Sequence, residues 1–373
     1  MHLTRLHIHQ VRNLNEVVLT CHPHFNLFLG QNGSGKTSVL EAIHLLALGR
    51  SFRSRHNHTI INHQQQQLAC FGEMVDDQIK TSMGIEKNRQ GDVKCKLGGE
   101  ICDKLSRFAT QLPLQLMTPE TFKLLLEGPQ ERRRFLDWGV FHVEHCFTEL
   151  CQRYQRLLKQ RNAALKQFPK SKTLHAWEKE LTDVGEKITY HRKQYIVGLL
   201  PFLVEAREYL LPSFDIQIHY EQGWQNHLTL EEALEKALSQ DQRFGYTSVG
   251  PHRAELALML DTHEAHQVLS RGQQKLLICA LHLAQAKQLY ASTGKKCLFL
   301  IDDLASELDG PNRERLIAAL AKEGHQLFLT GVEDAPWHNV CEKYQGQMFH
   351  VEHGRIAQTH GFTGLVAPIE LPT

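Results

Sequence analysis

The chain has 373 residues, of which 42% are hydrophobic and 22% are charged, so it reads as a globular sequence long enough for two or three domains. No apolar run approaches the roughly 20 residues of a membrane span, and the first residues lack the apolar core of a signal peptide. The nine cysteines are scattered and include no C-x-x-C pair, which indicates reduced thiols. We therefore expect a cytoplasmic protein with no membrane partner.

The overall charge is balanced, with 42 basic residues against 41 acidic ones. A globally basic nucleic-acid binder is not indicated, so any anionic partner must be met by a local patch. The 24 histidines are spread along the chain, and the densest group is His142, His145 and Cys146, with Cys151 further on. This group does not repeat the usual spacing of metal ligands, so we interpret its members as surface and core residues.

Strands dominate the first 118 residues. Apolar alternation and short apolar runs predict strands within 3–19 and over 26–29, 68–74, 79–85, 93–97 and 114–117. Helical spacing of apolar residues predicts one helix from residue 37. Pro119 follows the last strand and predicts the start of a helix, since proline is favoured at the first helical position.

The pattern changes twice in the remainder of the chain. Residues 119 to about 240 are mostly helical in pattern, with breaks expected near Pro169, Pro201 and Pro212. From about residue 247 strands and helices alternate again. There the predicted strands cover 256–260, 297–301 and 326–330, and the predicted helices cover 273–290 and 313–322.

A glycine-rich loop lies between the strand at 26–29 and the helix that follows it. Its pattern is G-x-x-x-x-G-K-[ST], in the strand–loop–helix context that a phosphate-binding loop requires. Backbone N–H groups and the helix N-terminus would cradle the phosphates of ATP, Lys36 would reach the β- and γ-phosphates, and the Thr37 hydroxyl would ligate Mg²⁺. The predicted ATP-binding residues of the loop are Gly30, Gln31, Asn32, Gly33, Ser34, Gly35, Lys36 and Thr37.

Paired acids follow the apolar strand at 297–301. Asp302 would support the Mg²⁺ shell, and Asp303 would orient or deprotonate the attacking water. An acidic turn after a core strand would have the same pattern, but the phosphate loop in the same chain favours the catalytic interpretation. We therefore assign Lys36, Asp302 and Asp303 as the predicted catalytic residues.

A third segment, LSRGQQK at 269–275, resembles the L-S-G-G-Q signature of ABC-type ATPases. In that class the signature lies at a helix N-terminus and binds the γ-phosphate held by the opposite subunit, which here implies contacts in trans from Ser270, Arg271, Gly272 and Gln273. The sequence SELD at 306–309 is similar to the S-x-L-D loop of that class. Arg271 replaces the first signature glycine, Asp303 replaces the usual Glu, and Thr330 stands where many members have a switch histidine. The first two departures predict slow turnover.

The number of residues between the phosphate loop and the signature-like segment distinguishes the subclasses of ABC-type ATPases. Transporter subunits keep these motifs closer together, and SMC-like proteins insert long coiled coils. A compact helical insertion between the motifs fits neither of these subclasses. With this insertion the chain resembles the RecF family of bacterial DNA repair proteins over nearly its whole length. The segments that carry the resemblance lie at 3–6, 11–14, 33–43, 114–120, 128–138, 158–165 and 250–253.

The RecF resemblance implies a fold and several residue roles. The fold is an α/β ATPase head of the P-loop ABC type, with a mixed sheet and a small antiparallel part, interrupted by a helical arm. The expected division is a first head half at 1–118, an arm at 119–246 and a second head half at 247–373. Arg12 and Asn13 would flank the nucleotide. Gln115 would contact Mg²⁺, or is an ordinary polar residue at a strand end, and the pair at 252–253 would brace the nucleotide or cap a turn.

The clearest local charge asymmetry follows residue 150. Between residues 151 and 172 there are seven basic residues and no acids, namely Arg153, Arg156, Lys159, Arg161, Lys166, Lys170 and Lys172. A solvated helix face would have the same pattern, but the family resemblance favours phosphate contacts with DNA, and we assign Arg153, Arg156, Lys159 and Arg161 to them. The arginines at 132–134 precede this stretch and could equally pair with Glu131 and Asp137.

The predicted function is an ATP-dependent switch in which two copies of the chain close around two ATP molecules and hold duplex DNA. The resemblance implies recognition of gaps or junctions between double- and single-stranded DNA, and loading of RecA together with RecR and RecO. Two alternatives remain at this point. One is a transporter-type ABC subunit, and the other is a scaffold that binds ATP with negligible turnover.

Overall fold

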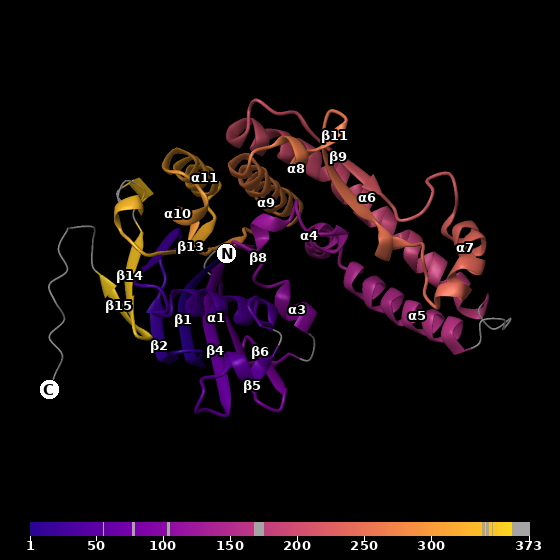
Figure 1. Cartoon of the computed structure of the whole chain (residues 1–373). Coiled ribbons are helices and arrows are strands. Elements are labelled where there is room, and N and C mark those ends of the chain that lie inside the picture. The colour runs from indigo at the N-terminus through magenta and orange to yellow at the C-terminus, as the bar shows by residue number, and fades with distance from the viewer. Residues whose placement is uncertain are drawn as a thin grey trace. The chain divides into compact units, whose positions relative to one another are not determined.

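The computed structural model describes residues 1–54, 56–76, 79–102, 105–167, 175–337, 340, 343–344 and 346–359. Its contacts divide the chain into two compact units, Met1–Pro119 with Lys296–Thr373, and Glu120–Lys295. Each unit is described by itself below (Figure 1). None of the helices in the described part is both long and apolar enough to cross a bilayer.

The first unit contains an antiparallel sheet built from the N-terminal strands. Its order is β2-β1-β4-β5-β6-β7. Leu6 and Ile8 of β1 are buried at alternate positions, as expected for a strand with one face on a core. The strands are β1 (His2–Val11), β2 (Leu14–Thr20), β4 (Gln67–Asp76), β5 (Ile79–Asn88), β6 (Val93–Leu97) and β7 (Glu100–Ile101). The predicted strands at 68–101 are therefore part of a larger sheet that includes the chain's first two strands.

A second, mixed sheet in the same unit has the order β15-β14-β3-β13-β12-β8. The strands β3, β8, β12, β13 and β14 run parallel to their neighbours, and β15 is antiparallel to β14. β3, β12 and β13 are buried along their whole length, as is typical of parallel strands covered on both faces. The bounds are β3 (Phe25–Leu29), β8 (Leu114–Met117), β12 (Leu298–Ile301), β13 (Gln326–Gly331), β14 (Gln347–Glu352) and β15 (Arg355–Thr359).

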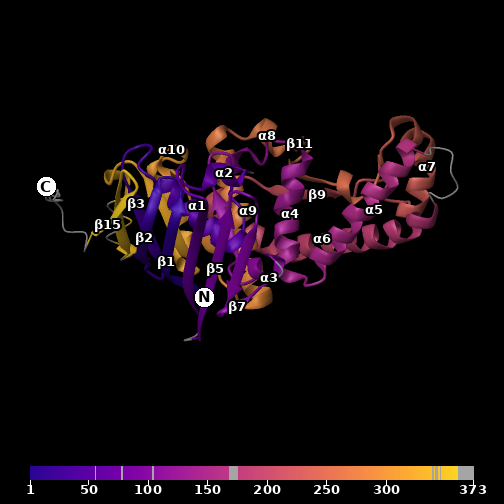
Figure 2. The same ribbon diagram turned by 90° about the horizontal axis from the view of Figure 1, so that it is seen from below.

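Helix α1 (Lys36–Leu48) lies between the two sheets. Its residues Leu40 and Ile43 belong to one buried apolar cluster together with Ile8 of the antiparallel sheet and Phe328 of the mixed sheet. Figure 2 shows α1 next to β1 and β5. Because α1 begins directly after the loop, this packing fixes the loop at the edge of the mixed sheet. The unit's remaining helices and turns are α2 (Asn57–Ile60), α3 (Leu105–Ala109), α10 (Leu304–Glu307), α11 (Gly310–Lys322) and η4 (Ala335–Trp337).

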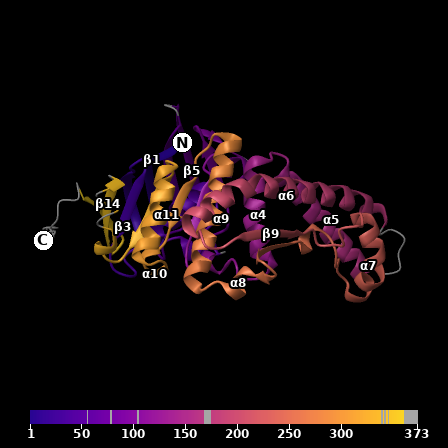
Figure 3. The same ribbon diagram turned by 90° about the horizontal axis from the view of Figure 1, so that it is seen from above.

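The second unit is mainly helical (Figure 3). α6 packs against α4, α5, α7 and α9, and a small antiparallel sheet has the order β11-β10-β9. The helices and turns are η1 (Thr121–Lys123), α4 (Pro129–Val143), α5 (Phe147–Gln167), α6 (His175–Leu210), α7 (Leu230–Phe244), η3 (Pro251–Arg253), α8 (Ala265–Val268) and α9 (Arg271–Thr293). The strands are β9 (Ile216–Glu221), β10 (Glu255–Leu260) and β11 (His263–Glu264).

Along the sequence, the first boundary between the two units falls after Pro119, close to the expected boundary at 118. The contacts group residues 247–295 with the helical unit, and not with the second head half. Two interactions explain this grouping. β10 pairs with β9, which lies before residue 247, and Gln288 of α9 donates to the carbonyl of Tyr195 in α6 at 3.0 Å. By contacts, the second boundary between the units lies between residues 295 and 296. The expected boundary between the arm and the second head half, at residues 246 and 247, stays a prediction.

Three local predictions differ from the structure. The helix expected at Pro119 begins instead at Pro129, with Gly128 as its N-cap, and only a 3₁₀ turn lies between. Both prolines carry the same signal, and the sequence does not distinguish them. The expected break at Pro201 is wrong because α6 continues through it, and burial of Leu199 and Leu203 offsets the lost hydrogen bond. Strands β9, β11, β14 and β15 were not predicted.

Candidate functional site: a phosphate-loop cavity

The loop and the paired acids meet at one edge of the mixed sheet. β3, β12 and β13 are parallel, so their carboxyl ends place Gly30, Asp302 and Thr330 side by side. A cavity of about 950 Å³ opens there. Its lining includes Arg12, Asn13, Asn32, Gly33, Gly35, Lys36, Thr37, Ser38, Arg53, Pro119, Asp302, Asp303 and Thr330. Of the predicted ATP-binding residues, Gly30, Gln31 and Ser34 line a second cavity of about 530 Å³, and the others line this one.

Two glycines of the loop are required by its path. A Cβ atom at Gly30 would lie 2.1 Å from the carbonyl oxygen of Val351, so only glycine fits beside β14. Gly35 has a φ of 122°, which side chains rarely adopt, and it is the N-cap of α1. The constraint at Gly35 is local to the loop, whereas that at Gly30 comes from β14, far along the chain.

Lys36 is folded back onto its own loop. Its ammonium donates to the carbonyls of Gly30 at 2.7 Å and Gln31 at 3.0 Å. Burial lowers the pKa of Lys36, whereas the nearby charges of Asp302 and Asp303 raise it. A phosphate in the loop would offer this cation a charged partner in place of two neutral carbonyls.

Asn13 holds the loop from the β1–β2 turn. Its side-chain amide donates to the carbonyl of Ser34 at 3.0 Å, and its side-chain oxygen accepts from the Ser38 hydroxyl at 3.0 Å. Its neighbour Arg12 pairs with the buried carboxylate of Glu41 through two hydrogen bonds of 2.8 and 2.9 Å. Both residues line the cavity, and their contact with a nucleotide stays a prediction.

The two acids are joined to the loop by hydroxyl groups. Thr37 donates to the carboxylate of Asp302 at 3.1 and 3.2 Å. Thr330 donates to the same carboxylate at 2.6 Å and accepts from the backbone N–H of Asp303 at 2.9 Å. Sequence reasoning treated Thr330 only as a missing histidine, yet its hydroxyl contacts the Asp302 carboxylate and the backbone N–H of Asp303. The signal that could have revealed this role is a polar residue directly at the end of a buried strand.

The electrostatics of Asp302 suit a divalent cation. Burial raises the pKa of Asp302, hydrogen bonds from Thr330 and Thr37 oppose that shift, and the negative charge of Asp303 adds to it. Because the folded pKa is raised, this carboxyl contributes stability that is lost as pH rises through that pKa in the cation-free chain. Its oxygens and the Thr37 hydroxyl are hard donors of the type that Mg²⁺ prefers, so these residues fit the metal.

Gln115 is not brought to this cavity. It lies in the middle of β8, opposite Phe299 of β12, and its side chain is buried. The strand reaches the cavity only four residues later, at Pro119. The predicted Mg²⁺ contact of Gln115 is therefore not supported by the geometry. Gln115 is a buried polar residue of the strand, near the alternative of an ordinary polar residue at a strand end.

The signature-like segment lies in the other compact unit, at the start of α9. Ser270 is the N-cap, and a capping box joins it to Gln273 through the Ser270 N–H at 2.8 Å and the Gln273 N–H at 3.4 Å. Ser270, Arg271 and Gly272 are exposed or only partly covered, so the rest of the first turn faces solvent. An exposed helix N-terminus of this length can bind an anion.

The SELD segment at 306–309 makes two contacts within its own unit. The Ser306 hydroxyl donates to the carbonyl of Asp303 at 2.8 Å. Asp309 is the N-cap of α11 and accepts from the N–H of Asn312 at 2.9 Å. Both contacts stabilise the turn after the paired acids.

The predicted DNA-binding residues divide into two groups. Arg153, Arg156 and Lys159 are exposed on α5, and Arg153 pairs with Glu180. Arg161 has 0% exposure, so its assignment to DNA is wrong. Its guanidinium is held inside the unit by Asp241 at 2.7 Å, Thr247 at 2.9 Å and Glu178 at 3.3 Å. Lys170 and Lys172 lie outside the described residues.

The arginines at 132–134 form ion pairs and hydrogen bonds within the second unit. Arg132 pairs with Glu255 at 2.7 Å, and Arg133 donates to the carbonyl of Ala254 at 2.6 Å. Arg134 pairs with Glu131, as one sequence alternative expected, whereas Asp137 pairs with Arg192 instead.

The pair at 252–253 caps a turn in the second unit. His252 contacts the Tyr154 hydroxyl at 2.8 Å and the carbonyl of Thr247 at 3.0 Å, and burial lowers its pKa to about 4. Arg253 lies over the ring of Tyr246. These contacts favour the turn-capping alternative over a brace for the nucleotide.

The mixed sheet, the loop after β3 and the acids after β12 define an ABC-type P-loop ATPase head. The sequence also matches the family described as RecF/RecN/SMC N terminal domain over residues 2–356. It is 43% identical over 357 residues to the DNA replication and repair protein RecF of Vibrio parahaemolyticus serotype O3:K6, covering 95% of this chain and 99% of that protein. The protein of the same name from Stutzerimonas stutzeri is 41% identical over 374 residues, covering 98% of this chain and 100% of that protein. The chain belongs to the RecF family.

Solved structures show the same fold. One described as the recombination mediator protein RecF-ATP in the RecFOR pathway has a TM-score of 0.85 at 24% identity, covering 96% of this chain and 97% of that one. An SmcHead bound to the C-winged helix domain of ScpA has a TM-score of 0.58 at 13% identity, covering 96% and 98%. The helical part is thus an insertion in a head fold shared with SMC proteins, as predicted.

Proposed function

We propose that this protein is an ATP-binding, DNA-directed ATPase of recombinational repair. The observation that carries the proposal is that Lys36, Thr37 and Asp302 line one cavity at the edge of the mixed sheet, where Thr37 donates to Asp302. It is supported by a relative named DNA replication and repair protein RecF and by a structural neighbour described with ATP. Family membership favours this role over a transporter subunit.

The chain's own residues suggest how hydrolysis would proceed. The loop and Lys36 would bind the β- and γ-phosphates, and Thr37 and Asp302 would hold Mg²⁺, which supplies charge neutralisation. Asp303 would orient a water for attack on the γ-phosphorus as the bond to the β–γ bridging oxygen breaks. In the capping box of α9 the Ser270 hydroxyl accepts from the Gln273 N–H, which leaves its own hydrogen free to donate. This hydroxyl and the first-turn N–H groups of α9 would be the donors to a γ-phosphate held by a second copy.

Hydrolysis in the presence and absence of DNA tests this function. We expect slow, Mg²⁺-dependent release of phosphate that increases when gapped duplex DNA is added. Tight ATP binding with no turnover under either condition would instead support the scaffold alternative. Co-purification with a membrane protein and a rate unaffected by DNA would support a transporter subunit. The protein would act in the cytoplasm, and RecR, RecO and RecA are the partners that family membership proposes.

ATP-dependent dimerisation can be tested at Gly272. A Cβ atom built there has no neighbour within 4 Å, so Gly272→Glu is sterically tolerated in one chain. The added carboxylate would repel a γ-phosphate at the start of α9, and we expect normal ATP binding but no dimer with ATP in sedimentation. Gln152→Glu, at an exposed position of α5, is the control with equal charge. Dimerisation of the Gly272 variant at wild-type ATP concentration would contradict the trans contact.

The exposed basic face of α5 can be tested by a triple substitution. Replacing Arg153, Arg156 and Lys159 with Ala should weaken DNA binding at low salt and flatten its dependence on salt. The log–log slope should fall by about 0.9 for each DNA phosphate that the variant no longer neutralises. Lys80, Lys94 and Lys96 are exposed in the other unit, and their replacement with Ala removes the same charge. An equal effect of both triple variants would show that net charge, and not this face of α5, determines binding.

A further inference from the structure

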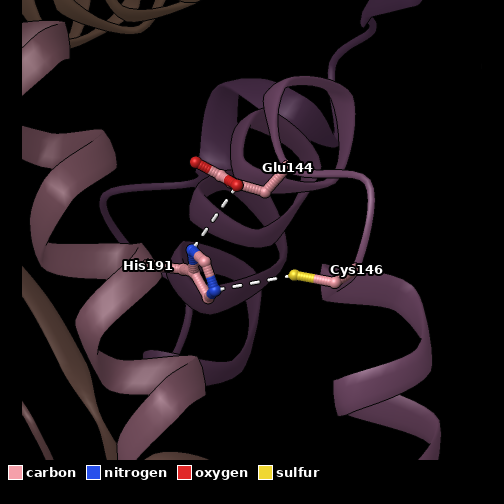
Figure 4. Close-up of side chains that lie close together, drawn as sticks. All are labelled: Glu144, Cys146 and His191. Atoms are coloured by element: carbon pink, nitrogen blue, oxygen red, sulfur yellow. Dashed lines mark hydrogen bonds and ion pairs between the residues drawn. The ribbon is translucent and has the colours of Figure 1, made fainter.

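Three potential metal ligands from separate segments meet in the second unit. Glu144 and Cys146 lie in the short link between α4 and α5, and His191 lies in the middle of α6. Their ligand atoms all lie within 4.8 Å of one another. Figure 4 shows the three side chains and the two contacts of the His191 ring. Among the described residues this is the group of Cys, His and acidic side chains close enough to share one ion.

The distance between two of these atoms matches a shared metal. Cys146 Sγ lies 3.6 Å from His191 Nε2. Zinc bonds of about 2.3 Å to sulfur and about 2.0 Å to nitrogen, at a tetrahedral angle, separate the two ligand atoms by about 3.5 Å. The two atoms contact each other directly in the ion-free chain, and their separation suits the ligands of one shared ion.

The second ring nitrogen of His191 has the partner that a metal-bound histidine usually has. Its Nδ1 lies 3.6 Å from a carboxylate oxygen of Glu144. This is an ion-pair distance, and a shift of a few tenths of an ångström would let the carboxylate accept the Nδ1 proton. A carboxylate in that position would direct the Nε2 lone pair toward the metal and orient the ring. Figure 4 shows Glu144 and Cys146 at opposite nitrogens of the ring.

The backbone holds the link in place without an ion. The N–H of Glu144 donates to the carbonyl of Val140 at 2.9 Å, and the N–H of Phe147 donates to the carbonyl of Glu144 at 3.1 Å. Phe147 is buried, so α5 is anchored directly after Cys146. Cys146 itself is exposed, which leaves a path for an ion from solvent.

We propose that Cys146 and His191 bind a zinc-class divalent cation, with Glu144 as the residue that orients His191 and with water in the remaining positions. A borderline-soft ion suits one thiolate and one imidazole. The ion ties the α4–α5 link to α6 and so stabilises the second unit. The nearby His142 is not part of the site, since it is buried against Trp138 and Phe141.

Cobalt(II) titration of the untagged, nucleotide-free full chain tests the proposal. One equivalent should produce a thiolate-to-cobalt charge-transfer absorption, which Zn²⁺ then abolishes by displacement. Zn²⁺ should also raise the melting temperature and slow alkylation of Cys146. Cys146→Ser should lose the absorption and the Zn²⁺-dependent rise in melting temperature, and His191→Ala should lose most of the affinity.

Glu144→Gln separates orientation from ligation. We expect it to keep the charge-transfer absorption while weakening cobalt affinity roughly 10- to 100-fold. Cys102→Ser and His227→Ala, at positions away from the cluster, are the controls and should bind cobalt like the wild type. An absent absorption in the wild type, or one that survives Cys146→Ser in a protein with normal melting, would overturn the proposal.

Discussion

Lys36→Met is expected to reduce ATP affinity by about 100-fold and to abolish measurable hydrolysis. The ammonium of Lys36 lies over the loop and donates to the carbonyls of Gly30 and Gln31, within the cavity that also contains Asp302. Replacing it removes the cation that would bind the β- and γ-phosphates, and a 100-fold loss corresponds to about 2.7 kcal/mol. Fluorescence titration with labelled ATP and a phosphate-release assay measure the two effects.

Lys179→Met is the matched control because it removes an exposed lysine from α6 in the other unit. It should leave both ATP affinity and hydrolysis within about twofold of the wild type, as expected for a surface substitution away from the site. Wild-type affinity together with wild-type hydrolysis in the Lys36 variant would contradict the assignment of this cavity to ATP. Loss of hydrolysis with unchanged affinity would restrict Lys36 to the transition state.

Arg161→Met is expected to destabilise the protein by about 3–5 kcal/mol, because it leaves the buried carboxylate of Asp241 without its cation. Arg161 and Asp241 both have 0% side-chain exposure, and their atoms are 2.7 Å apart. Methionine keeps most of the side chain's apolar length, so the loss reports the charge and not a large cavity. Denaturation with urea measures the change as a lower midpoint with an unchanged slope.

Two further variants make this result specific. Arg156→Met removes an exposed arginine from the same helix and should change stability by no more than about 0.5 kcal/mol. Adding Asp241→Asn to Arg161→Met removes the unpaired charge and should recover part of the loss. A midpoint of the Arg161 variant equal to that of the Arg156 variant would show that the buried pair contributes nothing to stability.

Arg156 and Arg161 show that a charge pattern in the sequence does not distinguish exposed basic residues from buried ones. Arg156 and Arg161 lie in one basic stretch, and the sequence assigns both to DNA. Arg161 faces Asp241 and Thr247, which are 80 and 86 residues away in the chain. Whether a basic residue is on the surface depends on those distant partners, so the pattern predicted the basic face of α5 but included one residue of the interior.

The site near the mixed sheet was more accessible to sequence reasoning. The loop, α1 and the acids after β12 each follow from a contiguous pattern, because glycines, a buried strand and a helix start are local requirements. Thr330 and Asn13 are different. Thr330 contacts the Asp302 carboxylate from a neighbouring strand, and Asn13 holds the loop from a turn about 20 residues earlier, so neither role has a local signature.

The sequence by itself determined that this chain has a phosphate loop, a pair of acids after a buried strand, and a helical insertion between the two halves of a head. These features depend on residues that are adjacent in the chain, where backbone constraints act directly. Only the tertiary structure decided that Thr37 meets Asp302, that Gln115 is buried within β8, and that Cys146 faces His191. Such contacts depend on strand order and helix packing, which bring together residues from 45 to 265 positions apart.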